Sequence, residues 1–297
     1  MNLNSQLNNQ LNMQLDTRQL DHQIDALSGF LDQHRRVLVL TGAGLSTASG
    51  IPDYRDKEGV RRGRTPIQGP DFRQSEAVRR RYWARSMAGW PTLAQAAPNV
   101  GHRALAELEA TGRIGALITQ NVDGLHQRAG TSKLIELHGN IHGVICLECR
   151  TLYQRTAIQQ WLAQANPELA ASAAAGADSV VPEARPDGDA EVELDALQDF
   201  HMPSCERCGG VLQPDVIFFG DNIPPQRTAA ALAMMAEADA LLVVGSSLMV
   251  FSGYRFCKLA AEAGKPIAAI NLGRTRADDL IGLKVEASAT EVLPKLL

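Results

Sequence analysis

Four cysteines form two closely spaced pairs in this 297-residue chain, Cys146-x2-Cys149 and Cys205-x2-Cys208. Two such pairs can bring four thiolates to the corners of a tetrahedron, which is the ligand set of a structural zinc ion. Because all four positions would be protein ligands, we expect this zinc to be structural and not catalytic. Disulfide bonds or unrelated cysteines are the alternative. The fifth cysteine, Cys257, is expected in the core of a helix.

A glycine-rich loop follows a short apolar run. Residues 37–40 predict a buried strand, and residues 41–47, apart from Leu45, are small and include two glycines. Such a loop lets the backbone approach a phosphate group, which N–H groups at the next helix can bind. The dinucleotide fingerprint would place a third glycine at position 47, where this chain has Thr47. A dinucleotide site, another phosphate site and a tight structural turn therefore all stay open on this stretch alone.

Other polar segments also follow predicted strands, at the carboxyl ends where open α/β sheets bind ligands. They are residues 119–126, 137–140, 244–249 and 270–275. Each is weak alone: the first could be a structural turn, and His138 could be a structural histidine, with His126 and His142 as competitors. Imidazole is nevertheless the side chain best suited to exchange a proton near neutral pH. Because loops after successive strands converge on one crevice, together they predict a ligand site.

Apolar strands that alternate with helices predict an α/β fold with a parallel sheet covered on both faces. The expected strands are residues 37–40, 114–120, 134–138, 216–219, 240–244, 266–270 and 283–285, and the expected helices are 19–34, 75–87, 101–111, 225–238 and 254–263. Residues 150–204 are expected to be an insertion with loose segments. The Asn/Gln-rich residues 1–18 are expected to be a disordered lead.

The charge balance argues against several classes of protein. The net charge is −4, so no basic excess predicts binding to nucleic acid. No apolar run predicts a membrane span, and the N-terminus has no signal-peptide pattern. We therefore expect a monomer in the cytoplasm. Ten Lys or Arg residues lie between positions 55 and 85; such a run is usually a solvated face, but beside a phosphate loop it could also contact an anionic ligand.

Taken together, these segments resemble the sirtuins, which are NAD-dependent protein deacylases, and within them the class II branch. The matching segments are residues 41–55, 119–124, 137–139, the two cysteine pairs, and residues 218–221, 245–248 and 271–273. The branch is indicated by residues 80–85, 186–189 and 252–256. The resemblance implies a Rossmann-type domain (residues 19–55, 91–142 and 212–297) with an inserted small lobe. Its helical module would be residues 56–90 and its zinc module residues 143–211.

The resemblance also assigns roles. NAD would be the co-substrate, acyl-lysine proteins the partners, and nicotinamide and 2′-O-acyl-ADP-ribose the products. His138 would be the general base, and Asn121 a second catalytic residue. The cofactor-binding residues would be Gly42, Ala43, Gly44, Ser46, Thr47, Asp53, Tyr54, Arg55, Gln120, Asn121, Val122, Asp123, Gly245, Ser246, Ser247, Asn271, Leu272 and Gly273. The substrate would contact Tyr82, Arg85, Val216, Phe218, Phe219 and Gly220, adding as a strand between two loops.

Three departures from the family pattern concern the site. Tyr54 stands where well-known deacetylases have phenylalanine, and Ser252 stands where proline is frequent. Many members read Gly-Thr-Ser where this chain has Gly-Ser-Ser. In addition, Tyr82-x-x-Arg85 is similar to the tyrosine–arginine pair that binds an acidic acyl chain in desuccinylating relatives, since an arginine can pair with a carboxylate. The two residues could equally be one face of a basic helix.

Three alternative functions remain open from the sequence. Protein ADP-ribosyltransfer on the same fold is one, and a non-catalytic NAD or ADP-ribose binding module is another. A hydride-transfer dehydrogenase is less favoured, because Thr47 breaks the fingerprint and no acidic residue ends the predicted second strand, 114–120.

Overall fold

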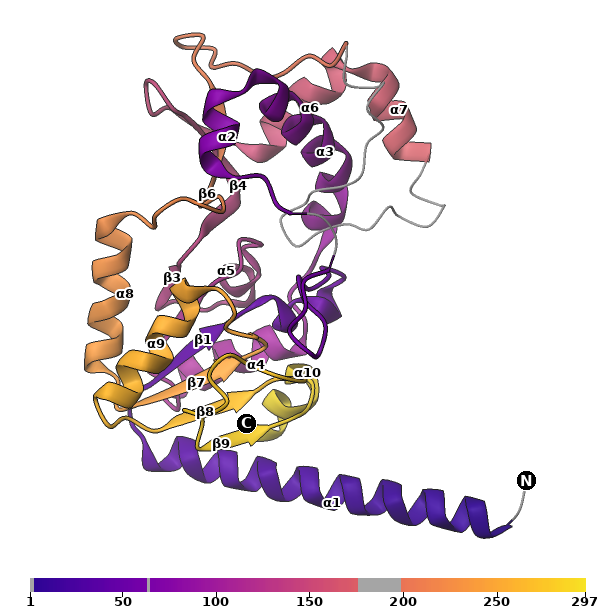
Figure 1. The fold of residues 1–297 in the computed structure, drawn as a ribbon, viewed down its shortest axis with the longest axis vertical. Helices are drawn as coiled ribbons and strands as arrows, with labels where there is room; N and C mark the ends of the chain where they lie inside the picture. Colours follow the sequence, from indigo (N-terminus) through magenta and orange to yellow (C-terminus); the bar gives the residue numbers. More distant parts are fainter. Residues whose placement is uncertain (1–2, 63–64, 176–198) are drawn as a thin grey trace.

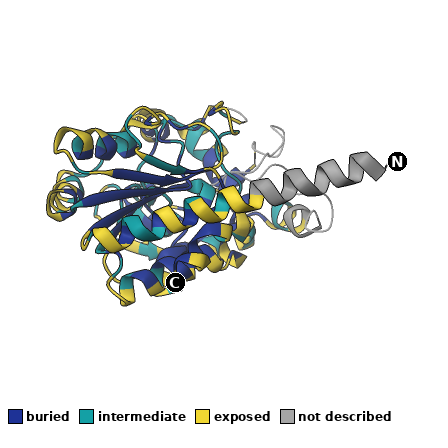
Figure 2. Cartoon of the chain, turned by 90° about the horizontal axis from the view of Figure 1, so that it is seen from below, coloured by how far each residue is buried: buried dark blue, intermediate teal, exposed yellow. Residues whose placement is uncertain are grey.

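The computed structural model describes residues 3–62, 65–175 and 199–297, and places a parallel sheet below a smaller lobe (Figure 1). The parallel sheet has the strand order β3-β2-β1-β7-β8-β9. Its strands are β1 Val37–Thr41, β2 Ala116–Thr119, β3 Leu134–Glu136, β7 Ala240–Val244, β8 Ile267–Ile270 and β9 Leu283–Val285. Every residue of β1 and β7 is buried, as expected for strands covered on both faces (Figure 2). The predicted α/β fold class is confirmed.

Side chains of β1 alternate between two hydrophobic clusters, because successive residues of a strand face opposite sides of the sheet. Val37 and Val39 pack in the cluster that includes residues of α1 (Leu3–Gln33), α4 (Val100–Ala110) and α10 (Ala289–Val292). Leu38 and Leu40 pack in the cluster that includes residues of α8 (Pro225–Glu237) and α9 (Phe251–Glu262). Cys257 of α9 belongs to the second cluster and is fully buried, which confirms its predicted place in the core.

The small lobe combines a three-stranded antiparallel sheet with helices. Its strands, in the order β5-β4-β6, are β4 Gly139–Cys146, β5 Leu152–Gln154 and β6 Leu212–Val216. Its helices are α2 Gly69–Gln74, α3 Glu76–Gln95, α6 Arg155–Ala165 and α7 Pro167–Ala175. Ser75 caps α3, since its hydroxyl accepts a hydrogen bond from the backbone N–H of Val78. None of the helices in the described ranges is long and apolar enough to cross a membrane.

Two sequence predictions differ from the structure. The expected strand at 216–219 is wrong: β6 ends at Val216 and pairs with β4 in the antiparallel sheet. The apolar run is explained by packing of Phe218 against the rings of Phe72 and Tyr82. The N-terminal helix begins at Leu3 and not near residue 19, because no glycine or proline precedes Gly29 to interrupt it. The acidic stretch of the expected insertion lies largely within residues 176–198, outside the described residues.

Candidate active site

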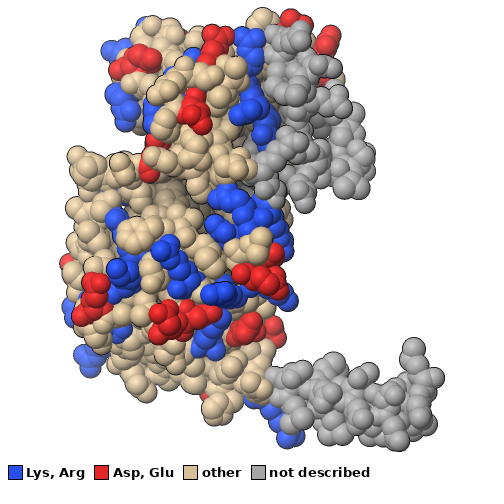
Figure 3. Space-filling view, viewed as in Figure 1, with Lys and Arg blue, Asp and Glu red and all other residues tan. Residues whose placement is uncertain are grey.

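A cavity of about 620 Å³ lies between the carboxyl ends of the parallel strands and the small lobe. In Figure 3 it appears as a hollow with Lys and Arg side chains gathered near it. The predicted site residues in its lining are Gly42, Ala43, Gly44, Ser46, Thr47, Asp53, Tyr54, Arg55, Tyr82, Gln120, Asn121, Val122, Asp123, His138, Val216, Phe218, Phe219, Gly220, Gly245, Ser246, Ser247, Asn271 and Leu272. Arg85 and Gly273 are the two cavity candidates that do not line it.

The loops after β1 and β7 are in direct backbone contact at one wall of the cavity. The N–H of Gly44 donates to the carbonyl of Gly245 across 2.8 Å. A Cβ added to Gly44 would lie 2.9 Å from that carbonyl oxygen, so a larger residue would separate the loops. Gly245 has φ +59°, a left-handed conformation that favours glycine. Gly44 and Gly245 therefore allow the loops after β1 and β7 to pack closely. Their neighbours Ala43, Ser46 and Ser247 line the cavity.

Thr47, which replaces the third glycine of the fingerprint, has a local role. Its Oγ1 donates to the carbonyl of Gly44 across 3.1 Å. This bond links two consecutive 3₁₀ turns, Ala43–Leu45 and Thr47–Ser49. This side chain-to-backbone bond holds the loop in its turn conformation.

A chain of hydrogen bonds fixes the polar residues after β2 against the glycine loop. Asn121 Nδ2 donates to the Gly42 carbonyl at 3.1 Å and to Ser46 Oγ at 3.0 Å. Ser46 Oγ in turn donates to Asp123 Oδ2 at 2.7 Å, and the other carboxylate oxygen accepts from the N–H of Leu125 at 2.9 Å. Ser46 and Asp123 are both buried. The network orients Asn121 and Asp123 before any ligand arrives.

His138 lies at the end of β3 with both ring nitrogens in hydrogen bonds. Nδ1 is 2.9 Å from the carbonyl oxygen of Gln120, and Nε2 is 2.8 Å from the hydroxyl of Ser252. Because a carbonyl can only accept, Nδ1 carries the proton and Nε2 accepts from Ser252. Burial lowers the pKa of His138, against the opposing effect of the bond to Gln120. The ring is thus neutral near pH 7, with a lone pair at Nε2 that can accept a proton.

The competing histidines do not share this position. Neither His126 nor His142 lines the cavity. His142 Nε2 lies 2.9 Å from the backbone carbonyl oxygen of Asp123. His126 is buried, and its Nε2 lies 2.9 Å from the hydroxyl of Thr41, which itself donates to the hydroxyl of Thr119 at 2.8 Å. His126 Nε2 must therefore carry the proton that Thr41 accepts.

His102 forms a buried pair with His126 that the sequence did not reveal. Its Nδ1 accepts from the N–H of Asn99, so its proton is on Nε2. The unpaired atoms of the pair are complementary: a donor at His102 Nε2 and an acceptor at His126 Nδ1, in rings whose centroids are 5.0 Å apart. Burial lowers the pKa of His102 to about 4 and of His126 to about 3. Both rings are therefore neutral supports beneath the loop after β2.

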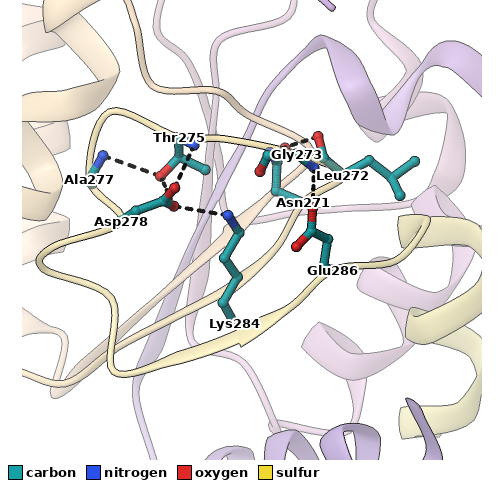
Figure 4. A network of polar contacts seen from close by, with 8 residues as sticks. All are labelled: Asn271, Leu272, Gly273, Thr275, Ala277, Asp278, Lys284 and Glu286. Atoms are coloured by element: carbon teal, nitrogen blue, oxygen red, sulfur yellow. Dashed lines mark hydrogen bonds and ion pairs between the residues drawn. The ribbon is translucent and has the colours of Figure 1, made fainter. Parts of the chain in front are cut away.

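The loop after β8 also lines the cavity and is held by a network of polar contacts (Figure 4). Asn271 Nδ2 donates to the backbone carbonyls of Leu272 and Gly273, both at 3.2 Å. Gly273 lies behind the wall: its N–H donates to the carboxylate of Glu286, and an added Cβ would lie 2.2 Å from the Lys57 carbonyl oxygen. Thr275 and Lys284 both bond to Asp278, which ties the loop to β9. The loop is thus held from two sides.

Residues 50–62 pass along the cavity and connect to that loop. Arg62 pairs with Asp53 at 2.9 Å, and Arg55 Nη1 donates to the Gly59 carbonyl at 2.9 Å. Tyr54 packs edge-on against Phe219, with ring centroids 6.4 Å apart. The guanidinium of Arg61 lies 4.8 Å from the centre of the same ring. Tyr54 therefore joins this segment to the residues that follow β6.

The four paired cysteines converge in the small lobe, away from the cavity. Their sulfur atoms all lie within 4.8 Å of one another. Zinc–sulfur bonds of about 2.3 Å in a tetrahedron place sulfur atoms roughly 3.8 Å apart, so the four thiolates fit one zinc ion. With four protein ligands, no coordination position is left for a substrate, and the predicted structural site is supported.

A model of the Sir2 family matches residues 42–252. The chain belongs to this family. It is 50% identical over 282 residues to an NAD-dependent protein deacetylase of Bordetella bronchiseptica, covering 95% of this chain and 99% of the relative. It is 51% identical over 268 residues to one of Xanthomonas campestris pv. campestris, covering 90% and 89%. The predicted family is confirmed.

Solved structures of the same family have a similar fold. A structure described as Sir2 with p53 peptide and NAD+ has 30% sequence identity and a TM-score of 0.68, covering 90% of this chain and 93% of that chain. A structure of Sir2 bound to acetylated peptide has 28% identity and a TM-score of 0.69, covering 92% and 96%.

Proposed function

We propose that the chain removes acyl groups from lysine side chains of proteins, with NAD as co-substrate and His138 as the general base. The observation that carries this assignment is the neutral His138, whose proton-accepting Nε2 faces Ser252 in the wall of a cavity that four strand-end loops share. The reaction class is that of the family, so the chain is an NAD-dependent protein deacylase.

The loops divide the binding of NAD among them. Residues 42–47 and 245–247, together with Asn271, hold the ADP-ribose part. Asn121 and Asp123, fixed by Ser46, bind the nicotinamide, and Gln120 binds its ribose. NAD supplies the ribose carbon that the acyl oxygen attacks as nicotinamide leaves. Because an amide oxygen is a weak nucleophile, these residues act mainly by orienting the two reactants and by excluding water.

His138 moves the proton. Its Nε2 accepts a proton from a ribose hydroxyl, and the Gln120 carbonyl holds the ring in the tautomer that makes this possible. The hydroxyl of Ser252 occupies the same nitrogen in the structure, so it must give way when the ribose is bound. The imidazolium that forms keeps its hydrogen bond to Gln120.

The protein substrate binds as an added strand between residues 216–220 and 247–250. Val250 and Phe251 support this arrangement, since both are exposed apolar side chains beside the cavity that a substrate backbone would cover. The solved relative with an acetylated peptide supports a peptide substrate as well. We extend the proposal to a monomer that acts in the cytoplasm, without nucleic acid or membrane partners.

The test is release of nicotinamide from NAD by the purified zinc-bound protein with an acetyl-lysine peptide. We expect deacetylated peptide and acetyl-ADP-ribose in equal amounts, identified by mass. Adenylate-labelled NAD distinguishes the alternatives. Label that stays on protein without acyl-ADP-ribose would indicate ADP-ribosyltransfer, and tight NAD binding without any nicotinamide release would indicate a binding module.

A further inference from the structure

Two consecutive residues of α2 anchor residues 217–221, a segment that overlaps the proposed substrate-binding residues. This segment follows β6 and belongs to no helix or strand. Phe72 stacks on Phe218 with ring centroids 4.9 Å apart, and both side chains are buried. Arg73 pairs with Asp221, which lies 148 positions later in the sequence. The two residues between these anchors line the cavity.

The ion pair between Arg73 and Asp221 is bidentate. Arg73 Nη1 donates to Oδ2 at 2.9 Å, and Nη2 donates to Oδ1 at 2.6 Å. The side chain of Asp221 is 16% exposed and that of Arg73 is 39% exposed. Two parallel bonds fix the direction of the carboxylate as well as its distance, so this pair is more rigid than most ion pairs at a protein surface. The hydrogen bond to Asp221 also raises the pKa of Arg73.

Backbone contacts bring the same segment against α2. The N–H of Gly69, the first residue of α2, donates to the carbonyl of Phe219 at 2.9 Å. A Cβ added to Gly69 would lie 2.1 Å from Asp221 Oδ2, so the carboxylate packs directly on the helix backbone. The N–H of Asp221 donates to the carbonyl of Phe218 at 3.1 Å, which closes a turn at Gly220, where φ is +82°. The segment is therefore held to α2 by a ring, by its backbone and by a carboxylate.

The ion pair fixes the end of the segment that lies farther from β6. At the near end, the N–H of Ile217 donates to the carbonyl of His138 at 2.8 Å. Beyond Asp221 the chain continues without a helix or strand as far as α8, which begins at Pro225. A loop that is not fixed must be ordered when a ligand binds, and the cost of this ordering weakens binding. Loss of the ion pair should therefore weaken the binding of a ligand that contacts this segment.

We propose that Arg73 and Asp221 are positioning residues for the protein substrate. Their ion pair holds residues 217–221 in the conformation to which the substrate backbone adds, so that little ordering is left for the binding step. Neither residue takes part in the chemical step. The proposal rests on the proposed function, which places the substrate at residues 216–220. It adds a requirement outside the cavity, since Arg73 does not line it.

The test measures KM separately for an acetyl-lysine peptide and for NAD, with the full-length zinc-bound protein. In Arg73→Gln we expect the KM for the peptide to rise about fivefold, as for the loss of a coupled ion pair. Both kcat and the KM for NAD should remain close to those of the wild type. Arg73→Lys keeps the charge but not the two parallel bonds, so its KM for the peptide should rise less. A merely structural role would instead lower the amount of active protein, and with it kcat, without changing either KM.

Asp221→Asn and the double variant test whether the two residues act as a unit. Asp221→Asn should raise the KM for the peptide by a similar factor, and the double variant should be no worse than either single variant. The matched control is Arg80→Gln, which removes an arginine from its 2.8 Å ion pair with Glu76 in the same lobe, outside the cavity lining. It should leave both KM values unchanged.

Several results would overturn the inference. They are an unchanged KM for the peptide in Arg73→Gln, an equal rise in the two KM values, additive effects in the double variant, and an effect of Asp221→Asn that Arg73→Gln does not share. The last result would indicate direct contact between Asp221 and a ligand, because Asp221 lines the cavity. If Asp221→Asn does not fold, Arg73→Gln and Arg73→Lys decide. Turnover by Arg73→Gln with wild-type KM values refutes this inference alone, whereas no nicotinamide release by the wild type with any peptide refutes the proposed function.

Discussion

The two halves of the cavity differ in the side chains that line them. In the half that we assign to NAD, Asn121, Ser46 and Asp123 satisfy one another through hydrogen bonds of 3.1 Å or less. In the half that we assign to the protein substrate, the lining includes the exposed apolar side chains of Val250 and Phe251. The first half is thus organised before its ligand arrives, as expected for a site that binds one invariant co-substrate. The second half presents apolar surface that a bound substrate would cover.

The small lobe contributes to the second half more than to the first. Tyr82 and Phe218 belong to its core and also line the cavity, and the core includes the zinc ligands Cys146 and Cys205. We expect Cys205→Ser to abolish deacylation, because loss of zinc releases this core. NAD binding should weaken less. Calorimetric titration with NAD and thermal unfolding with and without a chelator measure the difference; equal melting temperatures in both conditions would contradict it.

His138 lies between the two halves, so its removal should separate binding from turnover. We expect His138→Ala to lower kcat by about 10²–10⁴-fold, the usual contribution of a general base. The affinity for NAD should remain close to that of the wild type, since the network around Asn121 does not include His138. The control is His22→Ala on the exposed part of α1, which should keep full activity. A His138 variant with wild-type kcat would refute its assignment as the base.

Ser46→Ala should damage the organised half. The change removes the donor to Asp123 and one acceptor of Asn121, leaving buried polar atoms unpaired at a cost of about 1–3 kcal/mol. We expect the KM for NAD to rise about tenfold while the KM for an acetyl-lysine peptide stays unchanged. Ser132→Ala, on the exposed surface, is the control. A changed KM for the peptide without a changed KM for NAD would show that the halves are not separate.

The smallest effect concerns pH, through the histidine pair beneath the organised half. Burial lowers the pKa of His126 to about 3, whereas the unfolded chain has its ordinary value of 6.5. The unfolded state therefore binds more protons below pH 6.5, and the stability from the buried neutral ring is lost as the pH falls from 6.5 towards 3. Between pH 6.5 and 5 the loss is roughly 2 kcal/mol for this residue.

Urea unfolding at pH 7.5 and 5.0 measures this loss. His102 adds to it with the same sign, because burial lowers its pKa to about 4. The variant His126→Gln cannot take up the proton, so its stability should depend less on pH even if it is less stable at neutral pH. An unchanged pH dependence in that variant would contradict the buried neutral state.

The sequence predicted the parts of the fold in which local pattern and burial agree. The apolar runs of β1 and β7 were recognised because both faces of these strands are buried. The run at 216–219 is equally apolar, but Phe218 packs with Tyr82 at a cavity wall, and only the tertiary structure distinguishes the two cases. The extent of α1 was missed because the Asn/Gln-rich composition of residues 1–18 was read as a disordered lead, although Leu3, Leu7, Leu11 and Leu15 recur at helical spacing.

The candidate site was predicted where a loop follows a strand, and missed where a helix contributes. The glycine loop, Asn121 and His138 all follow strands, so their convergence could be expected. Ser252 was noted only as a departure from the family pattern, although it bonds directly to His138. Which side of α9 faces the cavity is set by its packing on the sheet, and the sequence does not show it.

Strand β4 connects the base to the metal site in a single element. It begins at Gly139, directly after His138, and ends at the zinc ligand Cys146, with an irregular register against β6 between Gly139 and Val144. His138 itself is held on both sides, by the Gln120 carbonyl at its ring and by the N–H of Ile217 at its own carbonyl. One strand thus joins the metal site of the small lobe to the residue that follows the base, so the position of His138 depends on the packing of both lobes.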